Sequence, residues 1–287
     1  MIEININPVF VIPILNFPIS WHGLFSFIGV IVAVFFVARW APYRGISSDT
    51  IYSIAIWAIL GGFIGARIVH VIDNWDIYGQ DYIRVFYFWK GGIGLWGGIL
   101  GGFVGGASYS FLKKYPVGII ADLTAPMMLI SQTIGRLGDI INGEHCSTAT
   151  DWIFGFKWIH PASSANYCLN GKVGENIASA HPAVLYEMIW NMLALLLLWK
   201  LKPYIRPDGM LFCVYLVLYA IGRFIISFFR EDPVWALGLQ EAQFISILVL
   251  VITIPILIVK ARINRSSNIP EDIAVVDHRT RAERRRD

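Results

Sequence analysis

The chain has 287 residues, of which 56% are hydrophobic and only 15% are charged. A mean hydropathy of +0.60 is too apolar for a water-soluble domain with a charged surface, so lipid must surround most of the protein. The formal net charge of +3 is modest, and we expect no nucleic-acid partner.

Repeated apolar runs are long enough to cross a bilayer. A hydrocarbon core of about 30 Å requires about 20 apolar residues in helical form. Helices are expected because an open sheet edge cannot be satisfied in lipid and the alternation typical of a barrel is absent. The sequence therefore predicts an all-α fold, a polytopic membrane helix bundle with about seven transmembrane helices. The predicted spans are Gly23–Arg39, Ile51–Ile72, Gly92–Leu112, Gly118–Gly135, Ala183–Leu201, Met210–Phe229 and Gln243–Lys260.

The loops between these spans alternate in charge, and lysine and arginine prefer short cytoplasmic loops. The alternation is unbroken across the seven spans, which places the N-terminus outside and the C-terminus in the cytoplasm. The basic loops carry Arg39, Arg44, Lys113, Lys114, Lys200, Lys202 and Arg206. The opposite loops carry Asp73, Asp76 and Asp81 against Arg84 and Lys90, and then Glu231, Asp232 and Glu241 against Arg230.

The domain organisation is simple. We expect residues 1–260 to form a single transmembrane bundle, with a small outer head at about residues 137–181, between the fourth and fifth helices. Residues 261–287 are polar and end in RAERRRD, which predicts a disordered cytoplasmic tail that can contact anionic lipid. No cleavable signal peptide is expected, because the N-terminus lacks a basic region and prolines interrupt its first apolar stretch.

Cysteine and glycine placement suggests packing rather than metal binding. No CxxC pair or His/Cys cluster has the spacing of metal ligands, so we expect no metal and no cofactor. Cys146 and Cys168 fall on the same predicted outer loop, where they are either a disulfide or two unrelated thiols. Glycines in the second and third spans, including the run GGIGLWGGILGGFVGG, predict a tight helix-packing seam at the centre of the bundle.

Charged residues inside or at the rim of a span are costly in lipid and are therefore functional candidates. Arg67, Arg136, Arg223 and Arg230 stand out. Two helical turns would place Arg223 and Arg230 on nearly the same face, an arrangement suited to an anionic headgroup. For Arg67, an internal network with a carboxylate or with carbonyls is an equal alternative.

A dense polar cluster follows Arg136. Asp139, Asn142, Glu144 and His145 occur within ten residues of it, and the two acids could orient arginines, act as a base or satisfy backbone groups. Farther along the chain, a histidine begins the segment HPAVLYE. For this residue, His181, a helix-capping role competes with a role in the site, and the cap is favoured because a proline follows.

The motif GRLGDIINGEH resembles the signature of the bacterial prolipoprotein diacylglyceryl transferases, G-R-x-G-N-F-x-N-x-E. Six further blocks resemble this family in the same order along the chain. They are ISWHGL, GGFIGARI, GGIGLWGGILGG, HPAVLYE, GRFIISFFRED and LQEAQFIS. The resemblance implies a multi-pass enzyme of the bacterial inner membrane whose site faces the outer leaflet.

The resemblance also implies the reaction and its partners. Such an enzyme takes phosphatidylglycerol from the membrane lipid and moves its diacylglyceryl group to the lipobox cysteine in the signal segment of a prolipoprotein. A thioether forms and glycerol 1-phosphate is released. The resemblance matches Arg136 and Arg223 to essential arginines, and Asn142 and Glu144 to the signature amide and acid.

From the residues and the resemblance together we predict two overlapping sets. The catalytic set is Arg136, Arg223, Glu144, Asp139 and His22. The set that binds the phospholipid headgroup is Arg136, Arg223, Arg230, Asn142, Arg67 and His181.

The chain departs from the family pattern at five positions. His22 replaces a tyrosine, Trp96 a histidine, Asp139 an asparagine, Ser147 a glycine and Ser227 a glutamate. A glutamate at position 227 would lie one turn beyond Arg223 and could hold its guanidinium. We therefore hypothesise that Asp139 supplies the carboxylate that Ser227 lacks. Because Trp96 cannot accept a proton, a general base would have to be His22, Asp139 or Glu144, unless the arginines alone ionise the incoming thiol.

Two other classes of function stay open. The departures are compatible with an idle homologue that binds phospholipid or lipoprotein signal segments without transfer. A transporter fits less well, because spans broken by midplane charge pairs and two-half symmetry are not evident.

Overall fold

The structure is a computed structural model, and it describes residues 1–12, 17–87, 91–92, 94–165 and 179–263. Cys168 and the predicted tail beyond Ile263 lie outside the described residues, as does part of the predicted outer head. The long helices are α1 (Trp21–Trp40), α2 (Ser48–Asp73), α4 (Leu95–Leu112), α5 (Val117–Asn142), α7 (Ala183–Leu201), α8 (Met210–Ile226) and α9 (Glu241–Lys260).

These helices confirm the predicted polytopic membrane bundle. Within the described residues, six of them are long and apolar enough to cross a membrane. The exception is α4, whose 18 residues include many glycines that lower its hydropathy. The count of seven spans and the orientation of the chain therefore stay predictions.

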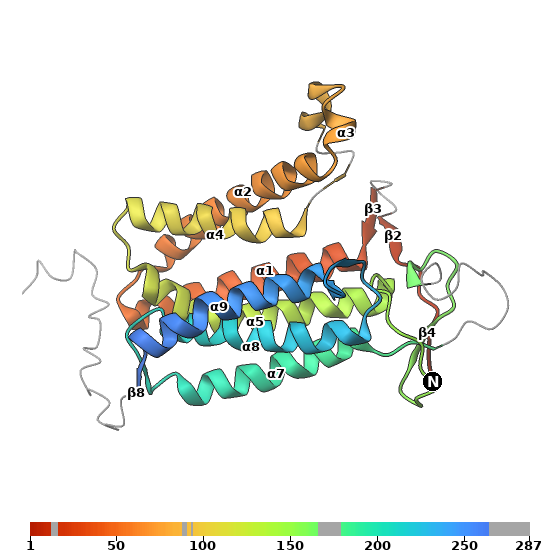
Figure 1. The fold of residues 1–287 in the computed structure, drawn as a ribbon. Coiled ribbons are helices and arrows are strands. Elements are labelled where there is room, and N and C mark those ends of the chain that lie inside the picture. Colours follow the sequence, from red (N-terminus) through yellow and green to blue (C-terminus); the bar gives the residue numbers. More distant parts are fainter. Residues whose placement is uncertain (13–16, 88–90, 93, 166–178, 264–287) are drawn as a thin grey trace, which may run out of the picture.

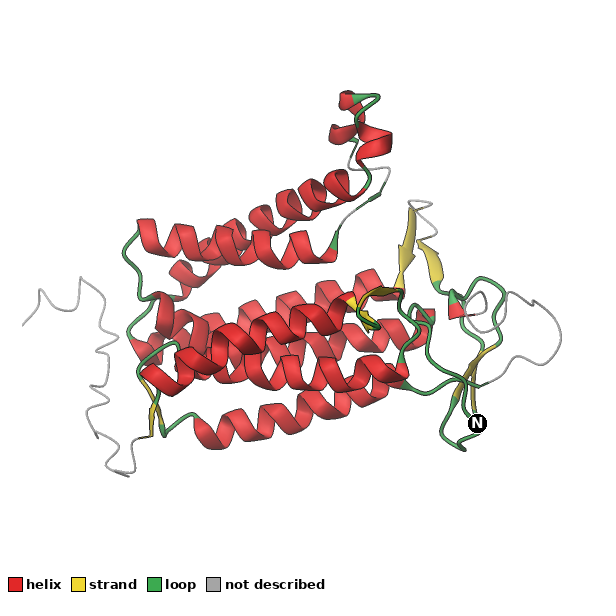
Figure 2. Cartoon of the chain, in the orientation of Figure 1, coloured by secondary structure: helices red, strands yellow, loops and turns green. Residues whose placement is uncertain are grey.

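Short elements lie at the two ends of the bundle (Figure 2). Four two-stranded sheets occur among the described residues, so the all-α prediction holds for the membrane part and not for the loops. The pairs are β1 (Ile2–Ile4) with β4 (Phe156–Trp158), β2 (Val9–Ile12) with β3 (Phe17–Ser20), β5 (Ile205–Arg206) with β8 (Arg262–Ile263), and β6 (Val234–Ala236) with β7 (Leu239–Gln240). The short helices are η1 (Ala41–Arg44), α3 (Trp75–Tyr78), η2 (Tyr82–Phe86) and η4 (Ser227–Phe229).

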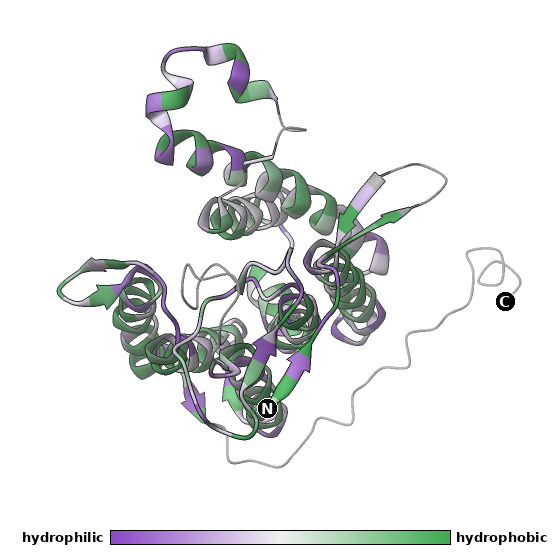
Figure 3. Cartoon of the chain, turned by 90° about the vertical axis from the view of Figure 1, so that its right-hand side faces the viewer, coloured by the Kyte–Doolittle hydropathy of each residue, from purple (hydrophilic) through white to green (hydrophobic). Residues whose placement is uncertain are grey.

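Helix α5 is the central element of the bundle (Figure 1). It packs against α1, α7 and α8, while α9 packs on α8. One buried cluster joins α5 to α1 and α2, and a second joins α5 to α7 and α8. Viewed from the end that carries β4, the helices are mostly apolar and the polar residues gather in the connecting loops (Figure 3). The charged side chains of α5 near this end are therefore the exception to be explained.

The glycine seam exists, but it does not lie at the centre of the bundle. It joins α2 to α4, and this pair lies to one side of the other helices (Figure 1). A Cβ atom on Gly65 would lie 2.3 Å from the carbonyl oxygen of Gly97, and one on Gly101 would lie 2.2 Å from that of Gly61. The two backbones touch, so these positions exclude any side chain. The predicted central position was wrong because contact between two helices does not reveal where the pair sits.

The outer head starts later than predicted. Helix α5 continues through the signature motif to Asn142, where Gly143 adopts a left-handed conformation and ends it. The predicted boundary at residue 137 therefore falls inside the helix. The head packs on the N-terminal strand β1. The buried cluster that joins them consists of Ile4, Phe156, Trp158, Ala165 and Ala180.

The orientation predicted from loop charge can be tested by labelling single cysteines in intact cells. Cysteines introduced as Lys113→Cys and Arg262→Cys should be shielded from an impermeant thiol reagent, while Asp151→Cys should react. The unsubstituted chain gives the background from its native cysteines. Equal labelling at all three positions would overturn the orientation with the N-terminus outside.

Candidate functional site

The site is built around one buried carboxylate, that of Glu187 near the start of α7. Its Oε1 accepts a hydrogen bond of 2.6 Å from Arg223 Nη1 and lies 3.3 Å from Arg230 Nη1, while its Oε2 contacts Arg136 Nη2. The Glu187 side chain is only 7% exposed. A single carboxylate thus holds three guanidinium groups that come from α5, from α8 and from the segment after α8.

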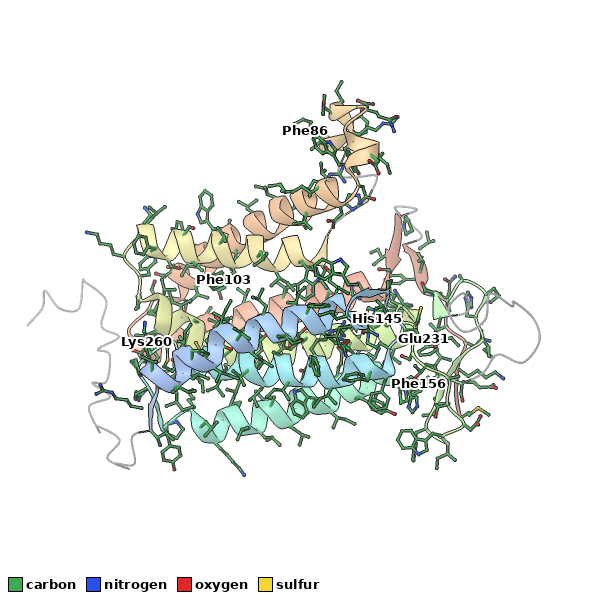
Figure 4. All side chains as sticks on the ribbon, viewed as in Figure 1. Phe86, Phe103, His145, Phe156, Glu231 and Lys260 are labelled. Atoms are coloured by element: carbon green, nitrogen blue, oxygen red, sulfur yellow. The ribbon has the colours of Figure 1, made fainter. Side chains whose placement is uncertain are left out.

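Arg136 also contacts one acid and one histidine near the C-terminal end of α5. Its Nη1 donates a 2.6 Å hydrogen bond to Asp139 Oδ2 and lies 3.0 Å from His145 Nε2. Asp139 lies three residues after Arg136, so the helix places both side chains on the same face. Asp139 is fully buried. Figure 4 shows His145 at the end of the bundle, where the helices meet the head.

Arg230 is the most deeply buried of the three arginines, with a side chain that is 3% exposed. It binds Asp232 in a forked manner, through Nε at 2.9 Å and Nη2 at 3.3 Å. Its Nη2 also lies 2.8 Å from His145 Nδ1. His145 therefore sits between Arg136 and Arg230 and links the signature motif to the segment after α8.

The ion pairs set the ionisation of Asp232, which lies outside the spans. Burial by itself would raise the pKa of Asp232, but the hydrogen bonds and charge of Arg230, together with the charge of Arg223, outweigh burial and hold this pKa below its ordinary value. A carboxyl group with a lowered pKa stabilises the fold above its unfolded pKa, and that contribution is lost as the pH falls through the folded pKa.

Arg223 and Arg230 converge, but not through the two helical turns that were predicted. Helix α8 ends at Ile226, a 3-10 turn spans Ser227–Phe229, and Arg230 is extended. Backbone hydrogen bonds from Thr148 to Phe229, and from Glu231 to Cys146, hold this segment against the loop that follows the signature motif. Arg230 is therefore placed by this loop rather than by helical periodicity.

The hypothesis that Asp139 replaces the missing acid at position 227 is wrong. The carboxylates near Arg223 are those of Glu187 and of Asp232, which lies 3.6 Å from Arg223 Nη2. Asp139 instead contacts Arg136, His145 and His22. Ser227 is buried at the end of α8, and its hydroxyl donates to the carbonyl of Arg223.

Glu187 itself was missed by the sequence analysis. The segment HPAVLYE was used only to detect a resemblance, although its glutamate is the single acidic residue of α7. An acid within an apolar span is the same signal that singled out the arginines. Applied to Glu187, this reasoning would have found the centre of the site.

His22 completes the site from α1. Ser20 caps α1 by accepting a hydrogen bond from Gly23, which fixes the first turn of the helix. The backbones of α1 and α5 touch here, since a Cβ on Gly138 would lie 2.6 Å from the Cα of His22. His22 Nδ1 hydrogen-bonds Asp139 Oδ1 and lies 3.4 Å from Glu144 Oε2. The His22 side chain is 44% exposed, in contrast to the buried Asp139.

The end of α5 is held rigidly beside these groups. Asn142 is buried, its amide nitrogen donates to Glu144 Oε1, and its own carbonyl accepts from Ser163. The indole of Trp158 donates to the carbonyl of Ile140. Since these contacts satisfy carbonyls that the helix end leaves open, the head fixes the geometry of the signature motif.

Arg67 and His181, which were also predicted to bind the headgroup, have other partners in the structure. Arg67 donates hydrogen bonds of 2.7–2.9 Å to backbone carbonyls in the segment from residue 84 to residue 92, and it stacks over Tyr78. This is the carbonyl network that we weighed as the alternative for Arg67. The Nδ1 atom of His181 lies 3.1 Å from the hydroxyl of Tyr186. The favoured capping role of His181 is wrong, because Pro182 holds the N-cap position of α7 and no side-chain hydrogen bond caps this end of the helix.

Three side chains of the site have donor atoms that a metal ion could use. Donor atoms of His22, Asp139 and Glu144 lie within 4.8 Å of one another and could hold a metal ion, a constellation that sequence spacing could not reveal. The guanidinium of Arg136, hydrogen-bonded to the same Asp139, opposes a second cation there. Cys146 is disulfide-bonded and Cys213 is free.

The arrangement can bind an anion and move a proton. Arg223 donates to Glu187 alone among the described residues, although a guanidinium has five N–H donors. Donors of this kind hold phosphate oxygens well, and the ion pairs keep them in place before the ligand arrives. The exposed imidazole of His22, next to two carboxylates, is suited to accept a proton.

Comparison with known proteins identifies the family. The chain matches the prolipoprotein diacylglyceryl transferase family over residues 9–259. It is 32% identical to the phosphatidylglycerol–prolipoprotein diacylglyceryl transferase of Lysinibacillus sphaericus (strain C3-41), over 88% of this chain and 91% of that protein. It is 34% identical to the enzyme of that name from Staphylococcus saprophyticus, over 85% and 86%. For Streptococcus pyogenes serotype M5 (strain Manfredo) the identity is 30%, over 85% and 91%. The chain belongs to the prolipoprotein diacylglyceryl transferase family.

Proposed function

We propose that this protein transfers the diacylglyceryl group of phosphatidylglycerol to the lipobox cysteine of prolipoproteins. The observation that carries the proposal is the cluster of Arg136, Arg223 and Arg230 around Glu187, in a chain of this family. We place the enzyme in the bacterial inner membrane, with residues 1–260 as one transmembrane unit and the site facing the outer leaflet.

The reaction requires a held leaving group and an ionised thiol. The cysteine sulfur attacks the terminal glycerol carbon of the diacylglyceryl group, so a C–S bond forms while the C–O bond to the phosphate breaks. Glycerol 1-phosphate leaves with the bonding electrons. Arg136 and Arg223 bind the phosphate oxygens as their charge grows, and Arg230, which is deeper, positions Glu187 and Asp232.

His22 takes the proton from the thiol in this mechanism. A carboxylate can only accept a hydrogen bond, so Asp139 keeps the proton of neutral His22 on Nδ1 and leaves Nε2 as the base. The family resemblance places a tyrosine at position 22 and an asparagine at position 139. These two departures contact each other, and together they supply a base in a chain whose third block has Trp96 in place of histidine.

The idle homologue is not favoured by the site. Its main support was the set of departures from the family pattern. The departure at Ser227 removes a carboxylate, yet Arg223 pairs with Glu187 and lies near Asp232. The direct test of the function is to incubate the purified protein with phosphatidylglycerol and a lipobox peptide, and to analyse the cysteine by mass spectrometry. A diacylglyceryl thioether is expected. Lipid binding without any modified cysteine would restore the idle homologue.

The arginines provide the first prediction for this assay. Arg136→Lys and Arg223→Lys should each lower the transfer rate by about tenfold or more, because lysine keeps the charge but loses the planar fork that holds two phosphate oxygens. The matched control is Arg84→Lys, an exposed arginine whose side chain is 55% accessible and pairs with Asp81. Near-normal rates in both site variants would place the headgroup elsewhere.

The second prediction concerns His22. His22→Phe should lower the rate by about 100-fold or more near neutral pH, the usual scale for loss of a general base. The loss should shrink as the pH approaches about 8.5, because the peptide thiol then ionises without a base. His160→Gln, a histidine of the outer head, is the control. A pH-independent loss would show that His22 has a packing role only.

A further inference from the structure

A cavity lies at the opposite end of the bundle from Glu187. It has a volume of about 360 Å³ and is formed by the last turns of α1 and α7, the 3-10 turn η1, the second and third turns of α5 and the first turn of α8. His22 and Glu187 lie at the other ends of α1 and α7, so this cavity does not belong to the reaction site. No residue of the arginine cluster or of the His22–Asp139 pair lines this cavity.

The polar side of this cavity is basic. Arg44 and Lys202 both line it. Arg44 Nη2 pairs with Asp208 Oδ1 at 2.7 Å. The ammonium of Lys202 lies 5.7 Å from the ring centre of Trp40 and forms no ion pair with any carboxylate in the described part of the chain. The carboxylate of the nearby buried residue Asp122 accepts hydrogen bonds from the backbone N–H groups of Gly209 and Phe212 at the start of α8. The two charged residues that line the cavity are thus both cations, and Lys202 is the one without a carboxylate partner among the described residues.

The other side of the cavity is apolar. Trp40 and Trp199 meet edge to face, with ring centres 6.0 Å apart, and the buried residues Leu123 and Leu198 form the wall. Tryptophan next to lysine or arginine is typical of the level at which lipid headgroups meet the hydrocarbon core. The cavity thus offers cations and a hydrocarbon surface to one ligand.

We propose that this cavity binds one anionic phospholipid of the adjacent leaflet, with its phosphate between Arg44 and Lys202. The glycerol backbone and the first carbons of an acyl chain would lie against Trp40, Trp199 and Leu198. A free phosphate ion would leave the apolar wall unused. A basic peptide segment would be repelled by the two cations. The bound lipid would tie α1 to α7 at the end of the bundle that the reaction site does not reach.

Phosphatidic acid is a suitable probe, because it has the phosphate and the acyl chains but no further headgroup. Delipidated protein is titrated with dioleoylphosphatidic acid, and the bound lipid is counted by native mass spectrometry. Because the reaction site can also hold an anionic lipid, the decisive quantity is the affinity that depends on Arg44 and Lys202. Dioleoylphosphatidylcholine and inorganic phosphate are titrated in parallel.

The wild-type protein should bind phosphatidic acid more tightly than either comparison ligand. Lys202→Gln, which breaks no ion pair, should weaken the binding of one lipid by about tenfold, and Arg44→Gln with Lys202→Gln should weaken it further. Lys200→Gln, an exposed lysine two residues away, is the matched control and should change nothing. Arg223→Lys should leave this binding intact, which separates it from the donor lipid.

Several results would overturn the proposal. They are wild-type affinity in the double variant, an equal loss in Lys200→Gln, or equal binding of phosphatidylcholine. Equal binding of inorganic phosphate would show a simple anion site instead of a lipid site. A loss of this binding in Arg223→Lys would assign the lipid to the reaction site. None of these outcomes depends on whether the protein transfers a diacylglyceryl group.

Discussion

The structure depends on the placement of the Glu187 carboxylate among three arginines. A buried carboxylate and a buried guanidinium are each costly alone, and the cost is offset only when partners satisfy both. Here one acid from α7 serves Arg136 from α5, Arg223 from α8 and Arg230 beyond α8. The three arginines can converge at the end of the bundle because Glu187 offsets part of the repulsion between their guanidinium groups. The same contact keeps the guanidinium groups oriented for an anion.

From this centre the polar network extends across the bundle to α1. His145 lies between Arg136 and Arg230, and Asp139 connects Arg136 to His22. The residues that we propose for phosphate binding and for proton transfer thus belong to one network, in which a shift of α1 or of the outer head would disturb both. The α2–α4 pair contributes instead through backbone contact at its glycines. Four helices contribute ion-paired side chains to the site, an arrangement that suits a reaction that needs its charges in place beforehand.

Much of this arrangement could be predicted from the sequence, and the errors have a common cause. Apolar runs located the helices, and the cost of charge in lipid singled out Arg136 and Arg223. The partner of Arg223 could not be found by local spacing, because Glu187 lies 36 residues away on another helix. The hypothesis that Asp139 supplies the carboxylate that Ser227 lacks was wrong for that reason. Periodicity shows which residues share a face of one helix, whereas the site is made of contacts between helices.

Replacing Glu187 tests the account most directly. In Glu187→Gln the carboxylate is lost while the size is kept, so three arginines lose their common partner, and the transfer rate with phosphatidylglycerol and a lipobox peptide should fall by about 100-fold or more. Glu187→Asp, which keeps the charge, should recover part of this loss. The conservative pair separates orientation of the arginines from misfolding, provided that both variants purify with the wild-type helix content. A folded Glu187→Gln protein with a wild-type transfer rate would contradict the account.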